Sequence, residues 1–144
     1  MQTTRTTVND ILTSHSLEPT SARKAVLKIC IASSKPLDVN FVVEKIGTKA
    51  HMATVYRTLE KFVEKGILER VDFQEGKFRY EYMHEHHHHH AVCNGCGKVE
   101  DIEDNGIDII ESAINKKTGF IVSRHTLELF GTCNKCQRSN NYVK

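Results

Sequence analysis

The sequence predicts an α+β protein of two small units, residues 1–83 and residues 84–144. Its 144 residues suffice for one compact unit or two very small ones. With 39% hydrophobic and 26% charged residues, the chain can bury a core and is not a disordered tail. The composition changes near residue 83: two histidines and one cysteine precede this point, and seven histidines and four cysteines follow it. The net charge of +2 divides into +3 for the first part and −1 for the second.

Neither end of the sequence nor its interior shows a membrane signal. No apolar run approaches the roughly 18 residues that a membrane-spanning helix requires. The N-terminal segment MQTTRTTVNDILTSH lacks the apolar block of a signal peptide. We therefore expect a soluble, cytoplasmic protein that does not bind membranes.

Helical patterns fill the start of the first unit. A short apolar stripe covers residues 8–12, and a second covers residues 25–30 after Thr20, whose hydroxyl can cap a helix. A third stripe, in VNFVVEKI, follows Asp38 in a capping position and ends at Gly47.

The strongest predicted helix is ATVYRTLEKFVEKGIL, whose apolar residues recur at helical spacing until Gly66 stops it. Two alternating segments follow, residues 67–73 and residues 77–83, separated by a turn that contains Gly76. Three helices and then a two-stranded hairpin are the order of a winged helix-turn-helix domain.

The second unit has the pattern of a small α/β domain. Strands are predicted over residues 91–93, 98–102, 120–123 and 126–130, and a helix over residues 106–117.

Two CxxC pairs, Cys93 with Cys96 and Cys133 with Cys136, predict a metal site. A CxxC turn places two sulfurs at about the separation that tetrahedral zinc requires. The 36 residues between the pairs exceed the usual zinc-ribbon interval, so the site would join two distant parts of the unit. Disulfides are not expected in a cytosolic protein, and a redox pair needs no second copy. An iron–sulfur cluster uses the same ligand type and stays open. Cys30, on an apolar helix face, is expected to be a small buried residue.

The run from His84 to His90 contains six histidines. In an extended strand His88 and His90 would face one way, and His87 and His89 the other, so that one segment could serve two metal sites. The alternative is a solvated polar loop with unspecific metal affinity.

One side of the strongest helix carries Tyr56, Arg57, Lys61 and Lys65, which suit phosphate contact and base reading. Charged residues also cover ordinary solvated helices, so this helix alone is weak evidence for DNA binding. The hairpin that follows it strengthens the prediction of a DNA-binding role.

Together, MATVYRTLEKFVEKGIL, the histidine run, CNGCGKVED and TGFIVSRHTLELFGTCNKC closely resemble the ferric-uptake-regulator family. The resemblance covers nearly the whole chain. It implies a metal-dependent transcriptional repressor that is a homodimer on double-stranded operator DNA, with no enzymatic activity and no small-molecule substrate. It also implies that the first unit is the DNA-binding domain and the second the dimerisation domain.

The resemblance further implies three ligand sets and a DNA-contacting group. They are Cys93, Cys96, Cys133 and Cys136 for structural Zn²⁺; Glu81, His88, His90 and Asp101 for a regulatory Fe²⁺, Mn²⁺ or Zn²⁺; His87, His89, Asp108 and His125 for a second-domain metal; and Thr54, Tyr56 and Arg57 for DNA. Three nitrogens and one oxygen in the second-domain set favour Zn²⁺ over a hard ion.

Two positions depart from the family pattern. The family usually has a histidine ligand before the third helix, where this chain has SSKPLDVN. The regulatory site therefore has fewer protein ligands, or His84 or another nearby group substitutes, or the site is occupied but closes weakly. Glu18 stands where the family has a basic residue for the minor groove, and an acid there repels phosphates.

Iron, peroxide and zinc sensing all fit the sequence, and manganese or nickel sensing stays open. Asp101 with His88 and His90 is compatible with the peroxide-sensing branch, whereas the missing histidine before the third helix counts against it. The alternatives to a metal-dependent repressor are a constitutive DNA-binding protein and a metal-buffering protein. A zinc hydrolase is not expected, because no motif pairs an open metal position with a general base.

Overall fold

The computed structural model describes residues 6–83, 88–103 and 106–139. The chain divides into two compact units, Met1–Met83 and His84–Lys144, at the point where the composition changes. Within the described residues no helix has both the length and the apolar character needed to span a membrane.

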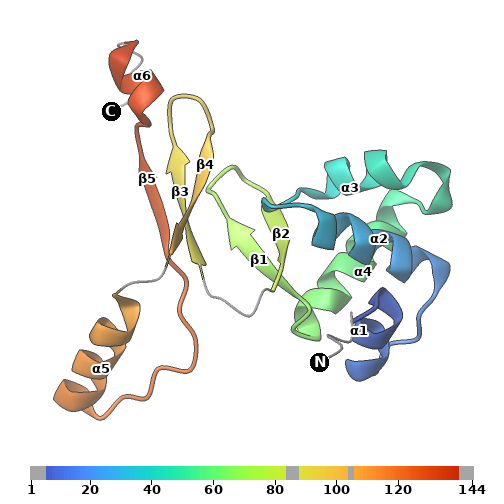
Figure 1. The fold of residues 1–144 in the computed structure, drawn as a ribbon, viewed down its shortest axis with the longest axis horizontal. Coiled ribbons are helices and arrows are strands. Elements are labelled where there is room, and N and C mark those ends of the chain that lie inside the picture. The colour runs from blue at the N-terminus through green and yellow to red at the C-terminus, as the bar shows by residue number, and fades with distance from the viewer. Residues whose placement is uncertain (1–5, 84–87, 104–105, 140–144) are drawn as a thin grey trace, which may run out of the picture. The chain divides into compact units, whose positions relative to one another are not determined.

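The first unit contains four α-helices and a two-stranded hairpin (Figure 1). The helices are α1 (Val8–Ser14), α2 (Ser21–Ala32), α3 (Val39–Ile46) and α4 (Met52–Glu64), with a 3₁₀ turn, η1 (Gly47–Lys49), after α3. The strands are β1 (Leu68–Asp72) and β2 (Phe78–Tyr82).

Side-chain caps begin two of these helices where the sequence predicts them. The Thr20 hydroxyl accepts a hydrogen bond from the Arg23 amide at the start of α2. The Asp38 carboxylate accepts one from the Phe41 amide at the start of α3. Each cap satisfies an amide that has no partner within the helix.

The core of the first unit lies between the helices and the hairpin. It buries Leu12, Val26, Leu27, Val42, Val55, Leu59, Phe62, Ile67, Leu68 and Tyr80. Cys30, 2% exposed, belongs to the same core, which confirms its prediction as a small buried residue.

The hairpin is tied to the segment that precedes α3. β1 and β2 pair antiparallel, and the backbones of Leu37 and Tyr80 exchange hydrogen bonds of 2.8 and 2.7 Å. Beside this bridge the Lys77 ammonium donates to Asp38 at 2.6 Å. The third helix is therefore joined to the wing at its first turn.

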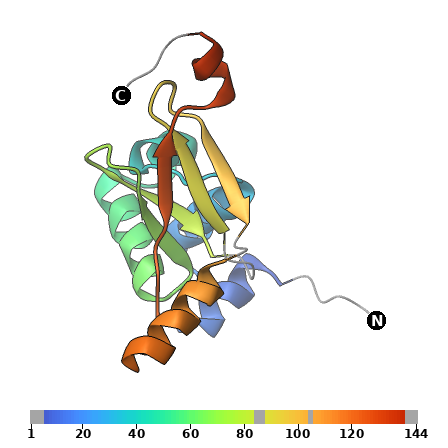
Figure 2. The same cartoon turned by 90° about the vertical axis from the view of Figure 1, so that its left-hand side faces the viewer.

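The second unit is built on a three-stranded sheet of order β4-β3-β5. The central strand β3 (His88–Cys93) pairs antiparallel with β4 (Val99–Glu103) and parallel with β5 (Glu128–Gly131). Helix α5 (Ile107–Thr118) and the short helix α6 (Asn134–Arg138) lie at opposite ends of the sheet (Figure 2).

The prediction of a strand at residues 120–123 is wrong, because the structure has no regular element there. The segment has the β-branched and aromatic composition of a strand. Among the described residues it pairs with no neighbouring strand, and its Phe120 and Ile121 are 68% and 81% exposed. The short helix α6 was not predicted.

Candidate metal centres and nucleic-acid interface

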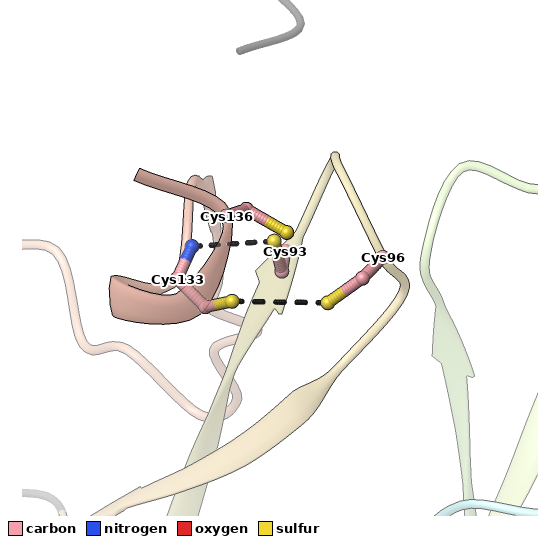
Figure 3. A group of neighbouring side chains, drawn as sticks. All are labelled: Cys93, Cys96, Cys133 and Cys136. Atoms are coloured by element: carbon pink, nitrogen blue, oxygen red, sulfur yellow. Dashed lines mark hydrogen bonds between the residues drawn. The ribbon is translucent and has the colours of Figure 1, made fainter. Parts of the chain in front are cut away.

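The four cysteines of the CxxC pairs converge at one end of the sheet (Figure 3). Cys93 is the last residue of β3, and Cys96 lies in the tight turn that follows. Cys133 occupies the position just before α6, and Cys136 lies inside the helix. Because β3 and β5 are parallel neighbours, the turn after one strand meets the helix after the other.

Their sulfur atoms all lie within 4.8 Å of one another. The Sγ atoms of Cys96 and Cys133 are 3.7 Å apart. Four sulfurs about 2.3 Å from a central tetrahedral Zn²⁺ would be about 3.8 Å apart. The cluster therefore has the dimensions of a tetrathiolate zinc site.

The thiol pKa differs between Cys93 and Cys136 of this cluster. The backbone amide of Cys133 donates to the Cys93 sulfur at 3.2 Å and lowers the pKa of Cys93 to about 6. Hydrogen bonding with Cys96 and burial raise the pKa of Cys136 to about 12. Four thiolates this close repel one another, and a bound cation removes that repulsion.

One face of β3 presents His88 and His90. Their ring centroids are 5.1 Å apart. Two imidazoles on one tetrahedral ion have ring centres about 5 Å apart, for metal–nitrogen distances near 2.0–2.1 Å. Asp101, opposite His90 in the β3–β4 register, has a carboxylate oxygen 4.0 Å from His90 Nε2. Glu81, the other predicted member of this set, lies on β2 of the first unit.

The other face of β3 presents His89, which is 7% exposed. Its ring centroid lies 5.2 Å from that of His125. His125 Nδ1 is 2.8 Å from an oxygen of Glu111, on α5. Asp108, the carboxylate that the sequence predicts for this set, is exposed in the first turn of α5. His87, together with His84, lies outside the described residues.

Helix α4 carries the predicted DNA contacts. Tyr56 is 49% exposed, Arg57 is exposed, and Thr54 is partly exposed beside them. They line a surface groove of about 760 Å³, whose walls also include Arg23 of α2 and Arg70 of β1. A groove with arginines from three elements beside an exposed helix suits a sugar–phosphate backbone.

A polar network that includes Glu60 and Arg70 of the groove fixes α4 to the hairpin. The buried Tyr80 donates from its hydroxyl to Glu60 at 2.5 Å, and Arg70 contacts the other oxygen of Glu60 at 3.5 Å. The Arg70 guanidinium also stacks on the Phe78 ring, 4.3 Å from its centroid. Glu60 of α4 is thus held by Tyr80 of β2 and by Arg70 of β1.

A winged helix joined to a unit rich in thiolate and imidazole donors defines the class of metal-responsive DNA-binding regulators. The chain belongs to the ferric uptake regulator family, whose model matches residues 14–130. It is therefore a metal-dependent transcription regulator and not an enzyme, which confirms the predicted fold class and function.

Relatives in several branches are similar to it. The peroxide operon regulator of Bacillus subtilis is 32% identical over 126 residues, covering 85% of this chain and 86% of its own. The crystal structure of the Vibrio cholerae ferric uptake regulator superposes with a TM-score of 0.74 at 31% identity, covering 87% and 98% of the two chains. A zinc-bound manganese uptake regulator superposes with a TM-score of 0.67 at 31% identity, covering 88% and 98%.

Glu111 is a residue of this site that the sequence did not predict. Its only signal is its position, three residues after Asp108 on the same face of a predicted helix. Glu60 and Tyr80 were not predicted either, since their contact joins residues 20 positions apart.

Proposed function

We propose that this regulator represses transcription as a homodimer that closes on an AT-rich inverted repeat when a regulatory metal binds. The observation that carries the proposal is that the candidate DNA contacts lie in one unit and the thiolate and imidazole clusters in the other. Tyr56 and Arg57 line a groove in one unit, while the thiolate and imidazole clusters lie in the other. In this proposal metal binding acts on DNA binding through the arrangement of the units. We also propose that the regulator works in the cytoplasm and has no small-molecule substrate.

Cys93, Cys96, Cys133 and Cys136 hold structural Zn²⁺ in this proposal. Four soft thiolates select zinc over hard ions, and their spacing supports a tetrahedral site. The ion would stabilise the end of the sheet where β3 and β5 stop.

Glu81, His88, His90 and Asp101 form the regulatory site. Mixed carboxylate and imidazole ligation suits Fe²⁺, Mn²⁺ or Zn²⁺. With only one of these residues in the first unit, metal would join the two units through a single carboxylate, because no histidine stands in the SSKPLDVN segment.

His87, His89, Asp108 and His125 form the second-domain site. The 5.2 Å between the ring centroids of His89 and His125 matches two imidazoles on one ion. The donor set favours Zn²⁺.

The second unit supplies the dimer interface. Family members bind DNA as dimers, and this unit leaves large apolar side chains uncovered. Ile109, Phe120 and Ile121 are 72%, 68% and 81% exposed, and Leu129 on the edge strand β5 is 46% exposed. Such a surface is typical of a subunit interface.

The decisive experiment measures operator affinity by fluorescence anisotropy without oxygen. The full-length protein, with its structural zinc retained, receives Fe²⁺, Mn²⁺ or Zn²⁺ in turn. We expect the cognate ion to tighten binding by about 5- to 150-fold, the usual range of allosteric coupling, and DNA to tighten metal binding by the same factor.

A double variant, His88→Ala with His90→Ala, should lose this metal response, whereas His15→Ala should keep it. Equally tight binding by the double variant would favour a constitutive DNA-binding protein. Metal uptake without any change in DNA affinity would favour a metal buffer. An added oxygen atom on His88 or His90 after Fe²⁺ and peroxide would assign the peroxide-sensing branch.

The DNA contacts have their own test. Arg57→Ala should cost about 1–3 kcal/mol on the cognate duplex and relax its sequence preference. Lys65→Ala removes a charge that can contact phosphate but not a base. It should weaken binding to all duplexes equally and reduce the slope of log affinity against log salt by about one. Glu18→Lys should strengthen binding if this position approaches the phosphates.

A further inference from the structure

We propose that Glu111 positions His125 for metal binding, by holding the imidazole in the tautomer that leaves Nε2 for the ion. This inference rests on the second-domain metal site proposed above. It adds to that site a carboxylate that acts through another residue and does not itself touch the metal.

The contact fixes the proton on one ring nitrogen. Glu111 Oε1 lies 2.8 Å from His125 Nδ1, a distance typical of a charge-assisted hydrogen bond. An ionised carboxylate only accepts hydrogen bonds, so Nδ1 must donate. In a neutral imidazole the other nitrogen, Nε2, then carries the lone pair that a metal requires.

The neighbouring ring lies where a second ligand should be. The centroids of His89 and His125 are 5.2 Å apart, and the ring planes are inclined by 53°. The His89 ring is buried, at 7% exposed, and the His125 side chain is partly buried, at 24% exposed. The pair therefore has the separation of two imidazoles on one tetrahedral ion, with His125 already oriented by its acid.

Helix α5 carries two carboxylates, to which we assign two different tasks. Asp108 and Glu111 are three residues apart, so they share one face of the helix. Histidine ligands commonly donate their second N–H to a carboxylate, which fixes the ring and raises its basicity. Asp108, exposed in the first turn of α5, would be the carboxylate that contacts the ion directly.

The test can isolate this contact because Glu111 contributes little to packing. No side chain of α5 is buried, and the Glu111 side chain is 32% exposed. Truncation at this position therefore removes the hydrogen bond without opening a cavity.

The experiment uses the full-length protein with the four-cysteine site loaded and measures Zn²⁺ affinity by competition with a chromophoric chelator. Glu111→Ala should weaken the second-domain site by about 10- to 100-fold, the usual effect of removing such a partner. Glu111→Gln, whose amide oxygen still accepts from Nδ1, should recover most of the affinity. Ser112→Ala, next on the same helix and exposed, is the matched control and should bind as the wild type does.

A second readout reports the tautomer itself. Imidazole ¹⁵N shifts of the protein without metal at this site should show His125 protonated at Nδ1 in the wild type and in Glu111→Gln. Glu111→Ala should shift the population towards the Nε2-protonated form. A purely structural role for Glu111 would leave this population unchanged.

The outcomes separate the inference from the site on which it depends. If His125→Ala binds as many ions as the wild type, both the second-domain site and the inference fail. If His125→Ala loses one ion while Glu111→Ala binds as tightly as the wild type, only the inference fails. Equal losses in Glu111→Ala and Glu111→Gln, with Nε2 protonated in the wild type, would overturn it in favour of Glu111 as a direct ligand.

Discussion

Replacing Tyr80 by Phe removes one hydroxyl from the contact that holds α4 against the wing. The ring is 2% exposed and stays packed, so the change leaves the core volume nearly intact. The hydroxyl donates to Glu60 at 2.5 Å. Hydrogen bonds to charged groups contribute about 1.5–3 kcal/mol, and water can reach the Glu60 side chain, which is 31% exposed. We therefore expect the free energy of unfolding of the first unit to fall by about 1–2 kcal/mol.

Urea denaturation followed by circular dichroism at 222 nm measures this loss. With a slope of about 1–1.5 kcal/mol/M for a unit of this size, the midpoint should fall by roughly 1 M at unchanged slope. Tyr56→Phe is the control, since this ring is 49% exposed and its change should move the midpoint little. An unchanged midpoint in Tyr80→Phe would refute the reasoning.

The same contact predicts a response to alkaline pH. Burial, and secondly the Glu60 hydrogen bond, raise the pKa of Tyr80 above its ordinary value of 10.0. The neutral phenol thus stabilises the fold below pH 10, and this contribution is lost as pH rises through the raised pKa. Tyr80→Phe should lose less stability than the wild type above that pH.

Three further predictions concern other parts of the chain. Asp38→Ala should lower the free energy of unfolding by about 1 kcal/mol through the lost cap, measured as a lower urea midpoint than in the wild type. The Lys77 hydrogen bond lowers the pKa of Asp38 below its ordinary value of 3.8. The difference in midpoint should therefore persist above pH 3.8 and vanish as pH falls through the lowered pKa. Cys96→Ser should remove the structural zinc, measured as metal content, and expose the second unit to protease; a variant that keeps its zinc would contradict the four-cysteine assignment. Burial raises the pKa of Cys30 to about 12, so a thiol reagent at pH 8 should label Cys30 only after denaturation, and labelling in the native protein would contradict its burial.

Local signals carried most of the correct fold prediction. The caps at Thr20 and Asp38 depend on residues three positions away, so the sequence displays both partners together. The CxxC pairs likewise contain their own turn geometry. Alternation along a strand was enough to separate His89 from His88 and His90.

Features that depend on distant partners were missed. The segment at residues 120–123 has strand composition, but pairing needs a neighbour that composition does not reveal. The contact of Glu111 with His125 joins a helix to a segment 14 positions away, and nothing near either residue indicates it. The parallel pairing of β3 with β5 is also invisible locally, since it joins residues nearly 40 positions apart.

That parallel pairing has a consequence for biosynthesis. β3 cannot complete its ladder, nor the CxxC turn its ligand set, until the segment with β5, Cys133 and Cys136 has left the ribosome. The four helices and the hairpin of the first unit form their hydrophobic core from residues within the first 83 and can fold earlier. Closing the long loop between the two CxxC pairs has an entropic cost, which a metal ion bridging both ends offsets. Zinc supply during translation should therefore limit how fast the second unit matures, while the first unit is already folded.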